Sequence, residues 1–544
     1  MSLLSRRRRA RRAVFVLAAF ATTMPTATAQ PVASHSSATP HVPTADRIRR
    51  IESGELISLG KNRAPLRLDL ARLMSVFHVP GLSIAVIDGS RIAWAKGYGV
   101  TETGTTNRVT PHTLFQAGSV SKTVAAAGAM ALVERGTLGL DDDVNAKLTS
   151  WKLPDNAFTA TQKVTLRRIL SHTAGVTVHG FDGYPVAGPI PSLRQILDGE
   201  KPATNAPVRV DLVPGTRWRY SGGAVEIEQQ LMMDVTHEQF PALMRELVLD
   251  KTGMTDSTFE QPLPPDRAAA AAAGTHADGK TIAGRWQVVP QMAAAGLWTT
   301  PTDLARFALA IAAAKHGARD GAISPATARA MLTPGVDVGE IALGDERHRD
   351  RMGLGFFLGD ATRPDLFGHI GDDPGFQAML MMFADSGQGV AVMANSENGI
   401  LLGDYLIERI AKEYGWKGYV PTVRQRIGAA SVLLVVFQTE GVNASLDAYR
   451  ELKLERLPRY SVTKNSLIAL GYAVYSAGSL RGAIDVMKIA VHDNPQYWNA
   501  YDSLGEMYAN AGDKPHAIEN YERSVQLNPQ NAGGIEALRK LRGS

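Results

Sequence analysis

Cysteine is absent from the 544 residues of this chain. Its absence excludes a disulfide framework, thiolate metal sites and a cysteine nucleophile. It is also compatible with an oxidising compartment, where a free thiol is a liability. Charged residues make up only 20% of the chain and hydrophobic residues 44%, which is typical of a globular protein. At this length we expect two or more domains.

Two signatures of other hydrolytic chemistry are also missing. The chain has no G-x-S-x-G stretch, which excludes the nucleophile elbow of α/β-hydrolases, and no H-E-x-x-H ligand cluster. The acidic run at 141–143 follows a turn, so we interpret it as a solvated helix cap in preference to a metal site. We therefore expect no metal and no organic cofactor.

The excess of positive charge is confined to one short segment. Residues 1–29 hold six arginines and no acid, so the formal net charge of +5 becomes −1 when they are set aside. The rest of the chain is nearly neutral, and neither nucleic acid nor an anionic surface is indicated as a partner.

The same segment, 1–29, has the three parts of a signal peptide. A basic region ends at Arg12, an apolar run covers 13–21, and Ala-Thr-Ala at 27–29 predicts a mature start near Gln30. The paired arginines at 11–12 weakly resemble a twin-arginine signal, so the export route stays open. A retained basic anchor helix is the alternative, although the run is too short for a stable span. We predict a periplasmic or secreted protein.

The chain then divides into a large mixed region and a helical tail. Residues 30–43 are small, polar and proline-bearing, which is typical of a flexible linker. Residues 44–415 carry strand signals at both ends, at 82–94 and 376–394, with helical patterns between them such as 120–135. This arrangement predicts one α+β domain whose sheet is completed by distant segments.

The tail at 441–544, which follows a connector at 416–440, contains a repeat. Five residue identities recur at a spacing of 34 residues: Leu470/Leu504, Gly471/Gly505, Gly478/Gly512, Ala483/Ala517 and Pro495/Pro529. This is the tetratricopeptide period and pattern, with repeats at about 464–497 and 498–531. Each repeat would be a helix hairpin that buries its apolar face on its neighbour.

Two segments before the repeats also have helical character. The apolar stretch at 429–437 predicts a buried helix, and the segment at 444–457 predicts a helix that stacks beneath the repeats. Repeats of this kind bind a protein partner or pack on their own chain, and both uses stay open.

Ser119 and Lys122 form an S-x-x-K motif at the start of a helical pattern. Three residues apart, they share one helix face, and the serine faces the positive helix end. A lysine in a partly dry site can become neutral and take the proton of the serine. The motif also occurs by chance in long chains, so a capping serine beside a solvated lysine is the competing interpretation.

Two further segments favour the chemical interpretation. Tyr220 lies in the turn-rich segment 214–222, and a tyrosine beside a lysine can act as a shared base or proton shuttle. A packed aromatic residue is the alternative there. His369 belongs to Phe-Gly-His-Ile-Gly at 367–371, which leads into a strand at Phe376, so we expect a histidine and a turn at the edge of a substrate groove.

In this order the segments resemble the S-x-x-K, Y-x-N and K/H-x-G motifs of class C β-lactamases, penicillin-binding D-alanyl-D-alanine peptidases and family VIII esterases. Residues 80–86, 138–143, 169–175 and 295–301 are similar to the same superfamily, so the resemblance covers about 65–410. It implies a β-lactamase/transpeptidase-like antiparallel sheet flanked by helices.

The resemblance also implies catalytic roles. Ser119 would attack an ester or amide carbonyl, and Lys122 and Tyr220 would manage the proton. His369 would hydrogen-bond the substrate or tune Tyr220. The relatives need no cofactor for this chemistry.

Substrate-binding residues follow from the same motifs. The backbone amides of Ser119 and of Asp372, which follows Gly371, would form the oxyanion hole. The asparagine of Y-x-N is Gly222 here, and a glycine cannot hydrogen-bond the acylamino group of a β-lactam or peptide. Losing that contact weakens discrimination for such substrates and favours an esterase or a different amidase.

We therefore predict a serine hydrolase that cleaves a small-molecule or peptide acyl substrate through an acyl-enzyme on Ser119. A β-lactamase or D-alanyl-D-alanine peptidase is one alternative. A non-catalytic scaffold that binds partners through its repeats is the other.

Overall fold

The computed structural model describes residues 43–57, 59, 64–338, 350–417, 419, 429–455, 462–529 and 531–543. The predicted signal peptide, nearly all of the predicted linker and part of the predicted connector lie outside the described residues. Among the residues that are described, no helix is long and apolar enough to cross a bilayer.

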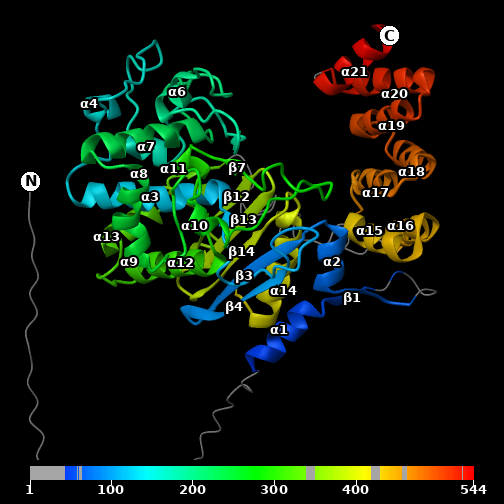
Figure 1. Cartoon of the computed structure of the whole chain (residues 1–544), viewed down its shortest axis with the longest axis horizontal. Coiled ribbons are helices and arrows are strands. Elements are labelled where there is room, and N and C mark those ends of the chain that lie inside the picture. Colours follow the sequence, from blue (N-terminus) through cyan, green and yellow to red (C-terminus); the bar gives the residue numbers. More distant parts are fainter. Residues whose placement is uncertain are drawn as a thin grey trace, which may run out of the picture. The chain divides into compact units, whose positions relative to one another are not determined.

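An antiparallel sheet of eight strands forms the centre of the first region (Figure 1). In spatial order its strands are β4 (Arg91–Gly99), β3 (Gly81–Asp88), β14 (Gln388–Ala394), β13 (Phe376–Phe383), β12 (Leu366–Asp373), β11 (Phe357–Leu358), β10 (Arg351–Met352) and β9 (Val336–Asp337). Strand β14 pairs with β3 in antiparallel register, with Val392 opposite Ile84. The predicted closure of the sheet by distant segments is confirmed.

Strand β13 shows how the sequence buries both faces of the sheet. Its even-numbered residues from 378 to 382 belong to one hydrophobic core, and its odd-numbered residues from 379 to 383 belong to the other. Successive side chains of a strand point to opposite faces, so an unbroken apolar run is suited to a strand covered on both sides.

Helices cover both faces of the sheet (Figure 1). The core that contains Ala378 is completed by η1 (a 3₁₀ turn, Gly118–Val120), α3 (Ser121–Glu134), α4 (Val144–Lys147), α5 (Leu166–Leu170), α6 (Leu193–Asp198), α7 (Gly222–Thr236), α8 (Phe240–Met244), η2 (a π-helical turn, Arg245–Leu249), α10 (Pro265–Ala268), α11 (Met292–Ala295), α12 (Pro301–Lys315) and α13 (Pro325–Met331). The short helix α9 (Asp250–Thr252) continues η2. The opposite core contains residues of α1 (Thr44–Glu52), α2 (Leu70–Val76) and α14 (Gly399–Tyr414).

Three two-stranded pairings complete this region. They are β1 (Glu55–Ile57) with β2 (Leu66–Leu68), β5 (Phe115–Gln116) with β8 (Trp298–Thr299), and β6 (Tyr184–Pro185) with β7 (Gln287–Val288). Strand β5 directly precedes η1, so its pairing with β8 fixes the start of the helix that carries Ser119.

A helical region follows the sheet domain. It consists of α15 (Ala429–Glu440), α16 (Val442–Glu455), α17 (Ser466–Ser476), α18 (Leu480–Asp493), α19 (Trp498–Asn510), α20 (Lys514–Leu527) and α21 (Ala532–Gly543). The two helices predicted before the repeats are present as α15 and α16, and α15 is buried along one side, as predicted. Helix α15 packs against α2, and one hydrophobic core continues from the sheet domain into this region.

The spacing of 34 residues in the sequence corresponds to equivalent positions in two packed helix pairs. Gly478 and Gly512 have φ of +89° and +75°, and each lies in the turn between the helices of its pair. Ala483 and Ala517 are both fully buried. These contacts are those expected of repeats, and the tetratricopeptide assignment itself stays a prediction.

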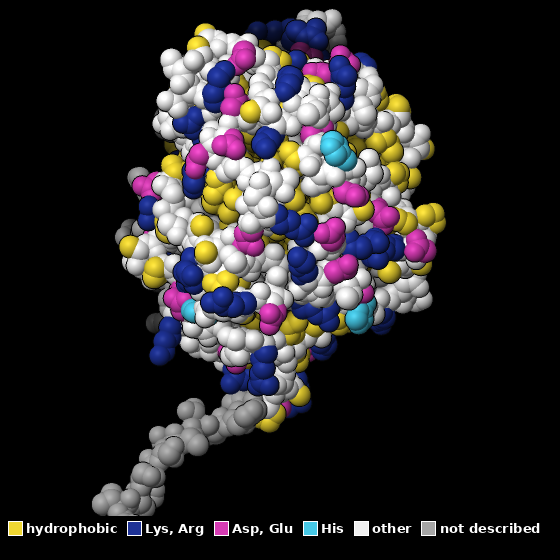
Figure 2. All heavy atoms as spheres, turned by 90° about the vertical axis from the view of Figure 1, so that its left-hand side faces the viewer, with side chains coloured by type: hydrophobic (Ala, Val, Ile, Leu, Met, Phe, Trp, Pro, Cys, Tyr) yellow, Lys and Arg dark blue, Asp and Glu magenta, His cyan; other side chains and the backbone are white. Residues whose placement is uncertain are grey.

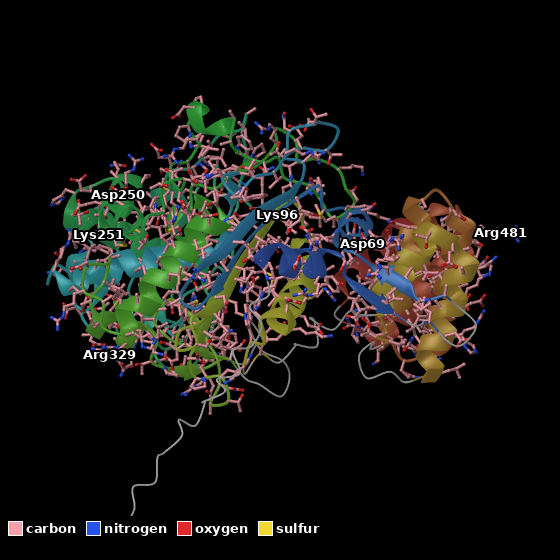
Figure 3. The ribbon with its side chains drawn as sticks, turned by 90° about the horizontal axis from the view of Figure 1, so that it is seen from below. Asp69, Lys96, Asp250, Lys251, Arg329 and Arg481 are labelled. Carbon is pink, nitrogen blue, oxygen red and sulfur yellow. The ribbon has the colours of Figure 1, made fainter. Side chains whose placement is uncertain are left out.

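Most charged side chains lie on the surface of the described part of the chain. Asp250, Lys251 and Arg481 are exposed and point away from the ribbon (Figure 3). On the face drawn in Figure 2, basic and acidic side chains are interspersed, without a large area of one sign. That mixture agrees with the nearly neutral charge calculated for residues 30–544.

Candidate active site

Helix α3 and the turn before it position the predicted nucleophile. Gly118 has φ of +50°, a conformation that side chains disfavour, and a Cβ on it would lie 2.5 Å from the amide nitrogen of Asp372. The glycine therefore lets the chain turn tightly beside β12 and places Ser119 in η1. The residues from Ser121 to Leu132 are all buried, so this helix is a rigid central support.

Ser119 and Lys122 are in direct contact. The Lys122 ammonium nitrogen Nζ donates a hydrogen bond to Ser119 Oγ at 2.9 Å and another to the backbone oxygen of Ala294 at 2.6 Å. The lysine is only 4% exposed, whereas Ser119 is partly accessible. A solvated lysine, the competing interpretation from sequence, is excluded by this burial.

Tyr220 lies beside this pair. Its ring centroid is 5.1 Å from Lys122 Nζ. Ser221 holds the tyrosine in place because it caps α7, accepting from the amide of Ala224 at 2.9 Å, while its own amide donates to Nδ1 of His172 at 3.3 Å. Tyr220 is therefore fixed at the point where a loop enters a helix.

An aromatic wall surrounds Tyr220. Ring centroids lie at 4.4 Å for His172, 5.1 Å for His179, 6.2 Å for His369 and 6.3 Å for Phe357, and the Phe357 ring is nearly parallel to the tyrosine. The four predicted catalytic residues are thus brought together. Sequence reasoning assigned no role to the other three rings, although the stretch around His172 was similar to the superfamily.

His369 lies within strand β12 and not in a turn, which corrects the expectation for 367–371. The glycines that suggested a turn serve a different purpose. A Cβ at Gly368 would lie 2.0 Å from the backbone oxygen of Leu380, and one at Gly371 would lie 1.9 Å from that of Ala117. These glycines allow β12 to approach β13 and η1 closely.

Both buried histidines are held in the neutral form. Burial, assisted by the nearby charge of Lys122, lowers the pKa of His369 to about 3 and that of His172 well below its usual value. The ring nitrogen Nδ1 of His369 lies 2.7 Å from the backbone oxygen of Ile370, and the buried Nε2 has no hydrogen-bond partner among the described residues. Nε2 of His369 is therefore a buried polar atom whose hydrogen-bonding capacity is unused among the described residues.

The two segments that carry the predicted oxyanion-hole amides lie close together. Strand β12 lies against η1, and a Cβ at Gly371 would lie 3.1 Å from the Ser119 amide nitrogen. The side chain of Asp372 is outside, where it accepts from Gln377 at 3.0 Å. Partial desolvation by its neighbours raises the pKa of the exposed Asp372, and full burial raises that of Asp373 well above its usual value.

Gly222 begins α7 and is buried. Its amide donates to the backbone oxygen of His179 at 3.0 Å. A Cβ at this position would lie 3.1 Å from that same oxygen and 3.1 Å from the ring of Phe181. The space that an asparagine side chain would need is therefore bordered by the loop that carries Phe181.

Residues 274–281 carry the letters of a phosphate-binding loop, G-x-x-x-x-G-K-T. In the structure Thr275 and Thr281 form an antiparallel bridge, and β7 follows in place of a helix. Such a loop binds phosphate at the N-terminus of the helix that follows it, so this segment lacks the necessary geometry.

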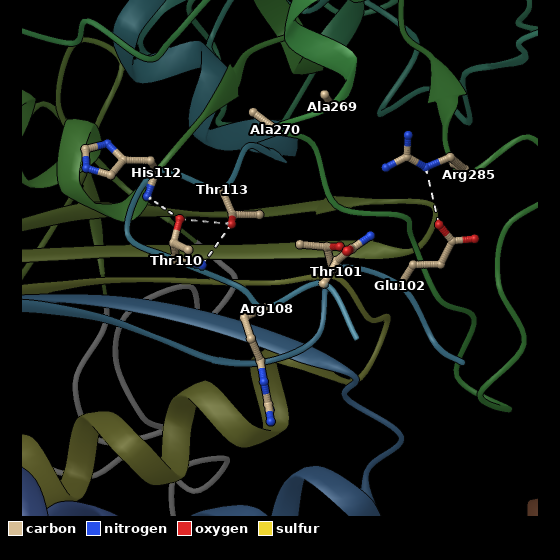
Figure 4. Close-up of a pocket in the computed structure, with 10 residues that line it drawn as sticks. Thr101, Glu102, Arg108, Thr110, His112, Thr113, Ala269, Ala270 and Arg285 are labelled. Carbon is tan, nitrogen blue, oxygen red and sulfur yellow. Dashed lines mark hydrogen bonds and ion pairs between the residues drawn. The ribbon is translucent and has the colours of Figure 1, made fainter. Parts of the chain in front are cut away.

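A separate pocket of about 650 Å³ lies near the chain turn at 101–113 (Figure 4). Glu102 and Arg285 lie on its wall, 3.6 Å apart. None of the predicted site residues lines it. The described residues contain no group of three potential metal ligands, and Asp143 caps α4 as predicted.

Comparison with known proteins agrees with this geometry. Residues 70–414 match the family described as Beta-lactamase. A penicillin-binding protein 4 from Amycolatopsis lactamdurans is 28% identical over 339 residues, which are 59% of this chain and 82% of that protein. The octameric penicillin-binding protein homologue from Pyrococcus abyssi has a similar fold, with a TM-score of 0.53, 23% identity and coverage of 65% of this chain and 77% of that one. The chain belongs to the Beta-lactamase family.

A further relative is the unguisins hydrolase ungD' of Aspergillus campestris. It is 32% identical over 216 residues, which are 36% of this chain and 36% of that protein. The chain therefore spans about a third of the length of this relative. The family match and the similar fold together confirm the predicted antiparallel β-lactamase-like sheet flanked by helices.

Proposed function

We propose that this protein is a serine hydrolase that cleaves an ester or amide through an acyl-enzyme on Ser119. The contact between Ser119 Oγ and the buried Lys122 Nζ at 2.9 Å carries the proposal. Because Lys122 Nζ lies within hydrogen-bond distance of Ser119 Oγ, it is placed to serve as the base for the serine.

The reaction would proceed in two transfers. Ser119 Oγ gives its proton to Lys122 and attacks the substrate carbonyl, while the backbone N–H groups of Ser119 and Asp372 donate hydrogen bonds to the developing oxyanion. Tyr220 then passes the proton held by Lys122 on to the leaving group as the bond to the carbonyl carbon breaks, so that Lys122 can again accept a proton. Water, deprotonated by the same groups, releases the acyl group from Ser119.

A neutral His369 supports binding of the substrate rather than proton transfer. Its Nε2 is buried without a partner among the described residues, and its ring lies beside those of Tyr220 and Phe357. This environment favours a flat or apolar acyl group with one polar contact.

The nature of the acyl substrate is proposed from Gly222. Without the amide of an asparagine, and with Phe181 beside α7, an ester or an unsubstituted amide fits better than an acylamino substrate. The relatives named as penicillin-binding proteins support a second candidate, hydrolysis of β-lactams or D-alanyl peptides.

We also propose export to the periplasm or medium, and a protein-binding or self-packing role for the repeats.

A fluorophosphonate probe tests the proposal directly. The wild-type chain should be labelled, Ser119→Ala should not be labelled at all, and Lys122→Ala should be labelled several orders of magnitude more slowly. A short-chain aryl ester, a chromogenic cephalosporin and a D-amino-acid peptide would then rank the substrate classes. Equal labelling of wild type and Ser119→Ala would instead favour a non-catalytic scaffold.

A further inference from the structure

Helix α7 carries two acidic residues into the protein interior. Glu226 is fully buried and Glu228 is 1% exposed. Glu226 Oε1 accepts a hydrogen bond from the amide of Ala294 at 3.1 Å, whereas its Oε2 and Glu228 Oε1 have no partner among the described residues. Buried carboxyl groups are costly, so their place beside a proposed active site calls for a functional reason.

One peptide group of α11 connects Glu226 with the proposed base. The amide of Ala294 donates to Glu226, and its backbone oxygen accepts from Lys122 Nζ at 2.6 Å. Lys122 Nζ in turn contacts Ser119 Oγ. Helix α11 has no ionisable side chain of its own. The link between Glu226 and Lys122 therefore consists of the Ala294 peptide group alone, with no further charge beside it.

Burial disfavours the charged forms of the titratable groups around this connection. Burial raises the pKa of Glu226 and of Glu228 to about 8, against the opposing effect of Lys122. His172 and His369, which face Lys122 from the other side, are neutral, and burial raises the pKa of Asp373 far above its usual value. Among these titratable groups, Glu226 is the one that is hydrogen-bonded to the Ala294 peptide group, whose oxygen accepts from Lys122.

We propose that Glu226 is a positioning residue, which holds the Ala294 peptide against Lys122 and, when ionised, keeps a proton on Lys122 and so withdraws the base from Ser119. This inference rests on the proposed function, because it requires Lys122 to act on Ser119. It goes beyond that function by assigning control of the base to a carboxyl group that does not touch the substrate.

The test compares Glu226→Gln with Glu228→Gln in the full chain. Glutamine keeps an oxygen acceptor for the Ala294 amide but cannot ionise. The rate at which the fluorophosphonate probe phosphonylates Ser119, with loss of fluoride, is measured against pH, with circular dichroism as the check on folding. In Glu226→Gln the rise of the rate with pH should have its midpoint about one pH unit or more below that of the wild type. Glu228→Gln, which is equally buried but lacks the contact with Ala294, should shift it clearly less.

Three results would overturn the inference. They are a Glu226→Gln profile that superimposes on the wild type, equal shifts in the two variants, and a wild-type rate in Glu226→Leu, which removes the hydrogen bond to Ala294. These results differ from failure of the proposed function, in which the wild type itself shows no labelling that depends on Ser119.

A measurement on the wild-type chain covers the case in which Glu226→Gln does not fold. The chain is labelled with lysine carrying ¹³C at the ε position, and the Lys122 resonance is identified by its loss in Lys122→Arg. This resonance should move as the pH passes through about 8, where Glu226 ionises. A resonance that does not respond in that range would exclude the coupling.

Discussion

Gly371 of β12 lies against Ala117 so closely that a Cβ at position 371 would be 1.9 Å from the Ala117 backbone oxygen. Both partners at this contact are backbone, so neither can move aside cheaply. The contact sets the distance between the amides of Ser119 and Asp372, which the proposed mechanism uses as an oxyanion hole.

Gly371→Ala should therefore impair acylation more than it impairs folding. The added methyl group would push β12 away from η1, and a displacement of about 1 Å at reacting groups can cost about 100-fold in rate. The rate of labelling by the fluorophosphonate probe and the midpoint of thermal unfolding are the two measurements. Gly180→Ala is the matched control, since a Cβ there meets no atom within 4 Å. Equal rates in the two variants would contradict the assigned role of Gly371.

Gly222→Asn should increase activity towards acylamino substrates only when Phe181 is also truncated. The ring of Phe181 and the backbone oxygen of His179 border the space that the new side chain needs. Overpacking of this kind typically costs about 1–3 kcal/mol of stability. Cephalosporin hydrolysis by Gly222→Asn/Phe181→Ala, relative to Phe181→Ala alone, is the measurement. No gain in the double variant would mean that position 222 does not contact the acylamino group.

His369→Asn should make the protein less sensitive to acid. The pKa of His369 is lowered to about 3 in the folded state, whereas in the unfolded chain the side chain takes up a proton near its ordinary value of 6.5. As the pH falls below 6.5, only the unfolded state gains this proton, so stability is lost by up to about 1.4 kcal/mol per pH unit until about pH 3.

Chemical denaturation at several pH values between 7 and 4 tests this slope. The free energy of unfolding should fall less steeply in His369→Asn than in the wild type. His237→Asn is the control, because His237 is exposed at the end of α7 with φ of +60°, a conformation that asparagine tolerates. A slope unchanged in His369→Asn would show that this histidine is not held neutral.

In the helical region, Gly505→Ala should destabilise more than Gly471→Ala. A Cβ at Gly505 would lie 3.1 Å from the stiff ring of Tyr521, whereas one at Gly471 would meet the flexible end of Met487. We expect a loss of about 1–3 kcal/mol for Gly505→Ala and a smaller effect for Gly471→Ala. Thermal unfolding followed by circular dichroism measures both variants. A larger loss for Gly471→Ala than for Gly505→Ala would contradict the steric argument.

The parts of the site that sequence could predict are those set by local spacing. Ser119 and Lys122 share a helix face because they are three residues apart, and the order of Tyr220 and His369 came from the resemblance to a superfamily. Helix boundaries near 120–135 and the pairing of strands at the two ends of the domain followed from hydrophobic patterns.

The remaining parts depend on contacts that leave no such pattern. Phe357 lies in a strand of two residues, too short to show periodicity. Glu226 and Glu228 are charged residues of a kind usually found on the surface, but both are buried in α7, which packs against other helices. The glycines of β12 suggested a turn because close backbone approach and turn formation select the same residue.

The pairing of β14 with β3 also sets an order of assembly. A chain emerging from the ribosome would present β3 with one edge unpaired until residues 388–394 had been made. The sheet that supports Ser119 is then completed late in synthesis, because its central strands come from both ends of the domain. Until β14 has been made and pairs with β3, the nascent chain therefore exposes a strand edge that is open to pairing with another chain.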